Sequence, residues 1–108
     1  MQITYKNKKI ADICCNPDKH IKEFGKKIIE NLKLALVIMT SMENLSDFQK
    51  PAHIKYRLEK LKNMNGLMSI RLDQKYRLTF YNSNDVPNAA FIEINEITIE
   101  NLSNHYKN

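Results

Sequence analysis

The spacing of apolar residues changes along this chain from a helical pattern in the first half to alternation in the second. Between Ile21 and Met39, apolar side chains recur at intervals of three and four residues, which places them on one face of a long helix. Gly25 lies inside that pattern, and close packing against a neighbouring element is its expected role. The residues from Lys8 to Cys15 also have helical spacing. The first half therefore predicts two helices.

Sequence signals at the start of each helix support this interpretation. Gln2–Tyr5 can form a short strand before the first helix. The second begins after Asn16, which can cap free backbone N–H groups, with Pro17 at the first helical position and Asp18 near the positive end of the helix dipole. A short helical turn and a loop ending at Pro51 follow the long helix.

The second half alternates apolar and polar residues, which is the pattern of half-buried strands. A phase slip near Glu96 indicates a bulge or a strand end before Ile97 and Ile99, and a polar tail follows from Asn101. The sequence thus predicts one α+β domain over residues 1–108. Two N-terminal helices pack on a mostly antiparallel sheet of four or five strands, in the order β-α-α-β-β-β-β. The alternating segments are residues 54–59, 68–72, 76–80 and 90–95.

Two of these strands form a predicted hairpin that carries two arginines. If residues 73–75 make a three-residue loop, Arg71 stands directly across from Arg77, on the face that also holds Ser69 and Thr79. Like charges that face each other across a ladder destabilise a sheet by roughly a few tenths of a kcal/mol or more. Because folding alone does not favour this arrangement, the hairpin predicts a site for an anion such as phosphate.

The charge distribution changes this picture by suggesting a large anionic partner. The formal net charge is +5, and residues 50–81 hold eight Lys/Arg against two Asp/Glu. Nucleic acid is favoured over a membrane surface, because the basic block falls on predicted strands rather than on an amphipathic helix. The alternative is an ordinary solvated lysine-rich surface.

Several kinds of chemistry are excluded by the residues present. With Gly25 and Gly66 as its two glycines, the chain has no nucleotide-binding glycine loop, and it contains no HExxH motif or spaced Cys/His pairs. Cys14 and Cys15 are adjacent, which suits neither an ordinary disulfide nor a metal site. We therefore expect no metal, no cofactor and no membrane span, and a cytoplasmic protein with reduced thiols.

The basic side chains that remain suit cleavage of a phosphodiester without a metal. Such a reaction needs one group to take the proton of the ribose 2′-OH, cations to stabilise the charged transition state, and another group to protonate the leaving oxygen. Lysine or histidine can transfer the protons, and arginine can stabilise the charge. The candidates are Lys60, Lys62, Arg71, Arg77, His105 and Tyr106.

The same segment resembles a known family. Leu58-Glu59-Lys60-Leu61-Lys62, a short loop through Gly66, Ser69-Ile70-Arg71 and Tyr76-Arg77-Leu78-Thr79-Phe80 resemble the RelE/HigB superfamily of toxins from toxin–antitoxin systems. The similarity is greatest to the HigB-like plasmid maintenance killer proteins, some of which are labelled killer suppression protein. The resemblance implies a ribosome-dependent mRNA endonuclease that acts through 2′-OH attack. It also implies a small helix-turn-helix antitoxin, HigA-like, as partner besides the ribosome and mRNA.

The resemblance implies specific roles for some of these residues. Lys62 would transfer a proton or stabilise charge, Arg71 and Arg77 would hold the scissile phosphate, and His105 would match the family histidine. Further contacts with RNA would come from Lys60, from Tyr81, which shares a face with Arg77, and from Tyr106. The loop Asn63-Met64-Asn65-Gly66 departs from the family pattern because it is one residue shorter and lacks the family's cation.

A second interpretation uses the same scaffold without catalysis. The chain could be a non-enzymatic interaction protein that binds an antitoxin or RNA, or an inhibitor of DNA gyrase like the ParE toxins. Fold alone does not separate these activities, because one scaffold hosts both.

Overall fold

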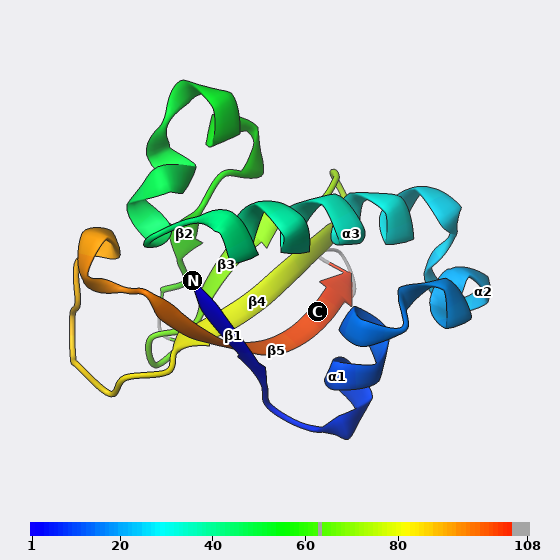
Figure 1. Ribbon diagram of the computed structural model, residues 1–108, viewed down its shortest axis with the longest axis horizontal. Helices are drawn as coiled ribbons and strands as arrows, with labels where there is room; N and C mark the ends of the chain where they lie inside the picture. Colours follow the sequence, from blue (N-terminus) through cyan, green and yellow to red (C-terminus); the bar gives the residue numbers. More distant parts are fainter. Residues whose placement is uncertain (63, 105–108) are drawn as a thin grey trace.

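A five-stranded sheet forms one layer of the fold, and helix α3 crosses one of its faces (Figure 1). The computed structural model describes residues 1–62 and 64–104. The strand order is β1-β5-β4-β3-β2, in which β1 runs parallel to β5 and all other neighbours are antiparallel. The predicted α+β class with a mostly antiparallel sheet is confirmed. The strands are β1 (Gln2–Tyr5), β2 (Glu59–Lys60), β3 (Met68–Arg71), β4 (Tyr76–Asn82) and β5 (Glu96–Asn104).

The helices occupy mainly the first half of the chain, as the spacing predicts. They pack on the sheet through an apolar stripe of α3 that includes Leu32, Ala35 and Met39, all of which are fully buried. Among the described residues, no helix is long and apolar enough to cross a membrane. The α-helices are α1 (Lys8–Cys15), α2 (Ile21–Phe24) and α3 (Lys26–Ser41). The 3-10 helices are η1 (Pro17–His20), η2 (Leu45–Gln49), η3 (Pro51–Tyr56) and η4 (Phe91–Glu93).

Gly25 ends α2 and precedes α3, so the single long helix predicted from the spacing is wrong. Its φ is 92° and its ψ is 152°, a conformation that residues with a Cβ rarely adopt. A Cβ added at Gly25 would meet no atom within 4 Å, so close packing is not the reason for the glycine. Glycine is present because the chain turns there.

The capping role predicted for Asn16 is also wrong. Asn16 precedes η1, but its side chain makes no capping hydrogen bond and instead donates to Asp12 Oδ1 at 2.9 Å. Asn7 provides a cap of the predicted kind at α1, where its Oδ1 accepts a hydrogen bond from the Ile10 N–H at 3.0 Å.

Two of the alternating segments form 3-10 helices instead of strands. Residues 51–56 belong to η3, where Ile54 is 60% exposed while Tyr56 is buried and packs edge-on against Phe48. Likewise, Ile92 in η4 is 68% exposed, although the alternation predicts it in the core. Pro51 begins η3 because proline fits the first turn of a helix and cannot donate to a ladder.

The last strand extends beyond the point where the polar tail was predicted to begin. Strand β5 pairs with β4 as far as Asn104. The register between the two strands shifts by one residue, because Thr79 pairs with Asn101 whereas Phe80 pairs with Ile99. Glu100 is therefore the extra residue of a bulge, four positions after the predicted slip. The bulge changes the parity of the strand, so Leu102 joins the buried apolar face even though it is three residues from Ile99.

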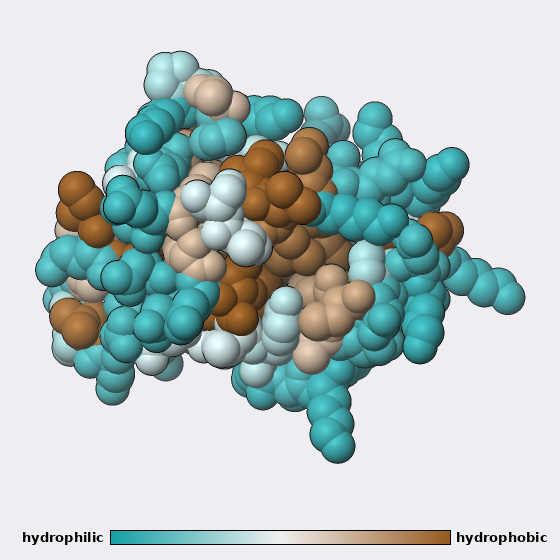
Figure 2. Space-filling view, in the orientation of Figure 1, coloured by the Kyte–Doolittle hydropathy of each residue, from teal (hydrophilic) through white to brown (hydrophobic). Residues whose placement is uncertain are grey.

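The two faces of the sheet differ in character. Ile70, Leu78 and Phe80 are fully buried beneath the helices. On the outer side of the helix layer, apolar side chains gather over α3 (Figure 2), where Leu34 is 50% and Val37 is 67% exposed. Strand residues of opposite parity, which include the hairpin arginines, lie on the face away from α3.

Candidate nucleic-acid interface

Arg71 and Arg77 are direct partners in the β3–β4 ladder, as predicted. The Leu72 N–H donates to the Tyr76 carbonyl at 2.9 Å, which makes 72 and 76 a hydrogen-bonded pair. Because such pairs alternate with non-hydrogen-bonded ones, the two arginines occupy a site where facing Cα atoms are only about 4.5 Å apart. Two positive side chains therefore project from adjacent positions on the face away from α3.

Glu59 compensates part of this charge. Its Oε1 lies 3.5 Å from Nη1 of Arg77, whose side chain is 16% exposed. On β2, Glu59 pairs in register with Ser69. The alternation placed Glu59 on the polar side of a predicted strand, but it did not give the register of that strand against the hairpin, so the contact with Arg77 was missed.

Arg71 has an incomplete set of partners. Its Nε is buried without a hydrogen-bond partner in the described part of the chain, and the same holds for Oγ of Ser69. An unpaired buried polar group costs roughly 1–3 kcal/mol, and more when it is charged. Both atoms belong to the arginine face, so this part of the fold carries unpaired buried polar groups.

A second carboxylate, Glu100, lies on the same face. Its Oε1 accepts a hydrogen bond from Thr79 Oγ1, and its Oε2 lies 3.7 Å from Nζ of Lys6. Thr79 is two residues from Arg77 on β4, so the bulge places this carboxylate near the arginines. The interface thus combines paired cations with carboxylates that are themselves held in place.

Lys60 and Tyr81 lie together, but in a separate pocket of about 390 Å³. The Lys60 ammonium donates to the Ala89 carbonyl at 2.7 Å and lies 5.2 Å from the centre of the Phe91 ring. These contacts fasten the segment after β4 to the sheet. Tyr81 is four residues from Arg77 along β4, or about 13 Å at the usual rise per residue. The structure therefore separates these two predicted RNA contacts from the arginine pair.

The remaining predicted residues are not assembled with the arginines. Lys62 is exposed in the turn after β2, and its side chain makes no hydrogen bond or ion pair within the described residues. His105 and Tyr106 lie outside the described residues. In residues 1–62 and 64–104, no group of three or more His, Cys, Asp or Glu side chains is arranged to hold a metal ion.

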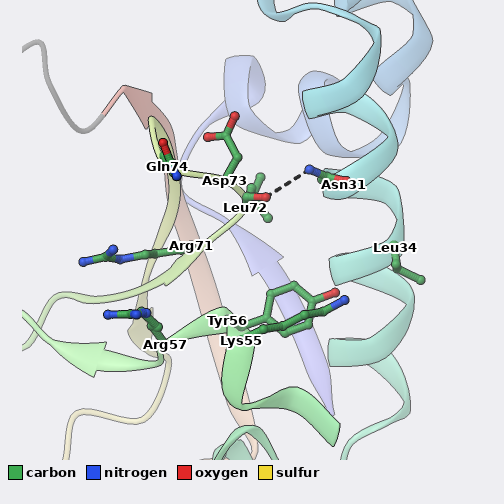
Figure 3. Close-up of a pocket in the computed structure, with 9 residues that line it drawn as sticks. All are labelled: Asn31, Leu34, Lys55, Tyr56, Arg57, Arg71, Leu72, Asp73 and Gln74. Carbon is green, nitrogen blue, oxygen red and sulfur yellow. Dashed lines mark hydrogen bonds between the residues drawn. The ribbon is translucent and has the colours of Figure 1, made fainter.

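A larger pocket of about 410 Å³ adjoins Arg71 and lies between η3, α3 and the loop of the hairpin (Figure 3). Arg57 and Lys55 also line it, and the guanidinium groups of Arg57 and Arg71 extend in the same direction, away from α3. Sequence reasoning missed Arg57 because the alternation placed it on the solvent face of a strand.

Comparison with protein-family models, with curated proteins and with solved structures finds no match for this chain. The family resemblance therefore depends on the motifs of residues 54–81 alone.

Proposed function

We propose that this chain is the toxin of a type II toxin–antitoxin system and cleaves mRNA on the ribosome. The observation that supports this function best is the pairing of Arg71 with Arg77, together with the buried, unpartnered Nε of Arg71. Guanidinium groups bind phosphate in a forked, charge-assisted geometry. A phosphate bound by the terminal guanidinium nitrogens would offset the repulsion between the arginines.

The proposed reaction is an intramolecular transesterification. The ribose 2′-oxygen attacks the adjacent phosphorus, the bond from phosphorus to the 5′-oxygen breaks, and a 2′,3′-cyclic phosphate forms. Arg71 and Arg77 stabilise the charge on the phosphorane-like transition state. Glu59, beside Arg77, accepts the 2′-OH proton, and Lys62 or His105 donates a proton to the leaving 5′-oxygen. No metal takes part in this proposal.

The proposed partners follow from the same assignment. The basic segment of residues 50–81 would contact mRNA and ribosomal RNA in the cytoplasm, mostly through phosphates. A helix-turn-helix antitoxin, HigA-like, would neutralise the toxin.

One observation favours a non-catalytic interaction protein as the second candidate. The Lys60 ammonium is already engaged by the Ala89 carbonyl and the Phe91 ring, and Arg77 is already paired with Glu59. A protein that only binds an antitoxin, RNA or DNA gyrase could keep these contacts throughout. Cleavage of mRNA separates the two candidates.

The test is induction of the chain in a bacterium followed by primer extension on abundant mRNAs. Wild type should arrest growth and produce new 5′ ends, and Arg71→Ala should abolish these ends. Lys27→Gln, which removes a cation from the exposed side of α3, is the matched control and should cleave like wild type. Growth arrest without new 5′ ends, or cleavage that persists in folded Arg71→Ala, would contradict the nuclease.

A further inference from the structure

Arg57 has a backbone conformation that its side chain does not favour. It terminates η3 with φ 48° and ψ 58°, in the left-handed region. The other described non-glycine residues with positive φ are Asn65 and Asn88. Asparagine tolerates this region through local hydrogen bonds, whereas arginine has no such compensation. Local folding therefore gives no reason for an arginine at residue 57.

Arg57 adds a third cation to the arginine pair. Glu59 pairs with Ser69, so the same register continued backwards would set residue 57 opposite residue 71. The strand ends before that point, yet Arg57 and Arg71 line one pocket and extend side by side (Figure 3). Arg57, Arg71 and Arg77 thus form a row that crosses the strands, which we call the arginine row.

The pocket beside the arginine row has a cationic end and a mixed end. Its carboxylate, Asp73, is engaged by the backbone N–H groups of Lys75 and Tyr76, each at 2.7 Å. On the α3 side, the Lys55 ammonium and the Tyr56 hydroxyl extend toward the helix (Figure 3). Leu34, which is half exposed, also lies there, as does Asn31, whose Nδ2 donates to the Leu72 carbonyl at 3.0 Å. That bond leaves Asn31 Oδ1 as an acceptor with no partner among the described residues.

We propose that this pocket binds one nucleotide of single-stranded RNA. Its phosphate lies between Arg57 and Arg71, and its base lies toward Leu34 and Asn31. The volume of about 410 Å³ lies within the usual range of small-molecule sites, about 300–1,000 Å³. The Leu34 side chain offers an apolar contact to a base, and the Asn31 Oδ1 can accept a hydrogen bond from an exocyclic amine. This inference rests on the proposed function in one respect: the bound nucleotide is the neighbour of the scissile phosphate held by Arg71 and Arg77.

The RNA strand would consequently cross the sheet perpendicular to its strands. Neighbouring strands are about 4.8 Å apart, so successive phosphates would meet Arg57, Arg71 and Arg77 in turn. Arg71 would contact both phosphates, which agrees with its central place in the row.

The test is an NMR titration that observes the arginine Nε–H groups of the free chain. Adenosine 3′-monophosphate is the probe, and inorganic phosphate is the comparison. We expect the nucleotide to shift the Nε–H signals of both Arg57 and Arg71 and to bind at least about tenfold more tightly than phosphate. Arg57→Asn, which suits the left-handed backbone, should weaken nucleotide binding at least about tenfold. Lys9→Gln, which removes a cation from the exposed side of α1, away from the pocket lining, is the matched control.

Equal affinity for phosphate and nucleotide would overturn the assignment of a base to the pocket. Nucleotide affinity unchanged in Arg57→Asn would overturn the arginine row. These outcomes are independent of the proposed function, which primer extension tests separately. If the chain binds the nucleotide but does not cleave mRNA, the proposed binding pocket stands and the nuclease is rejected. If it cleaves mRNA but does not bind the nucleotide, the nuclease stands and the binding pocket is rejected.

Discussion

Glu59 and Arg77 reach toward each other over β3, which lies between their strands, and their charged groups are 3.5 Å apart. Beneath this ion pair, β3 carries Ser69, which is fully buried. The pair therefore ties the short β2 to β4 and holds a carboxylate beside the proposed phosphate site.

Glu59→Gln tests the proton acceptor of the proposed reaction. The amide keeps the size of the side chain but cannot take the 2′-OH proton, so mRNA cleavage should fall about a hundredfold or more. The free energy of unfolding should change by less than about 1 kcal/mol, because a partly exposed ion pair contributes little. Quantitative primer extension and urea denaturation measure the two effects. Full cleavage by Glu59→Gln would assign the proton to another group.

Lys60 and Lys62 offer a matched pair of substitutions. Lys60→Gln loses the bond to the Ala89 carbonyl and the contact with the Phe91 ring, so unfolding should become easier by about 1 kcal/mol. Lys62→Gln should leave stability within about 0.5 kcal/mol, because the side chain is exposed, yet it should reduce cleavage. Urea denaturation of both variants would refute this division if their stabilities fell equally.

Cys14 and Cys15 should differ sharply in reactivity. Burial raises the pKa of the Cys14 thiol to about 12, so almost no thiolate forms there at pH 8. Cys15 is exposed. Iodoacetamide at pH 8 should therefore modify the native chain once, at Cys15, and the urea-unfolded chain twice. Peptide mapping checks the site, and rapid double labelling of native protein would show that Cys14 is accessible.

Arg57→Gly should increase stability while it weakens RNA binding. The left-handed conformation costs a residue with a Cβ about 1–2 kcal/mol, and glycine avoids this cost. Glycine also loses more conformational entropy on folding, which offsets about 0.5–1 kcal/mol of the gain. The net gain should reach up to about 1.5 kcal/mol, measured by urea denaturation. A loss of stability in Arg57→Gly would show that the arginine contributes to the fold through its own contacts.

The sequence was sufficient to predict the arginine pair because a hairpin is a local structure. Alternation assigns Arg71 and Arg77 to one face, and a three-residue loop fixes their register. The contact between Glu59 and Arg77 was not predictable, because it depends on how the segment after Lys60 returns to the sheet. Asn65-Gly66 in that segment is a turn signature, and both residues have positive φ, but the connection from Lys60 to Met68 is longer than a two-residue turn, so the dipeptide alone does not fix the register.

The other differences between prediction and structure also have local physical causes. Ile54 lies between polar residues and Ile92 recurs at every second position with Ala90 and Ile94, but each pattern is too short to separate a strand from a 3-10 helix. Gly25 has the same sequence signal whether it serves packing or a positive φ. Only the position of the bulge explains how both Ile99 and Leu102 are buried.

The parallel pairing of β1 with β5 also orders events during synthesis. Ile3 pairs with Ile97, so the first strand to be translated must wait for the last one before it has a ladder partner. Contacts of such long sequence separation form slowly, because the intervening chain must first be closed into a loop. The arginines of β3 and β4 leave the ribosome earlier, but β5, which joins them to β1, does not yet exist. A nascent chain interrupted before β5 would thus carry the proposed phosphate-binding residues without the complete sheet on which they are arranged.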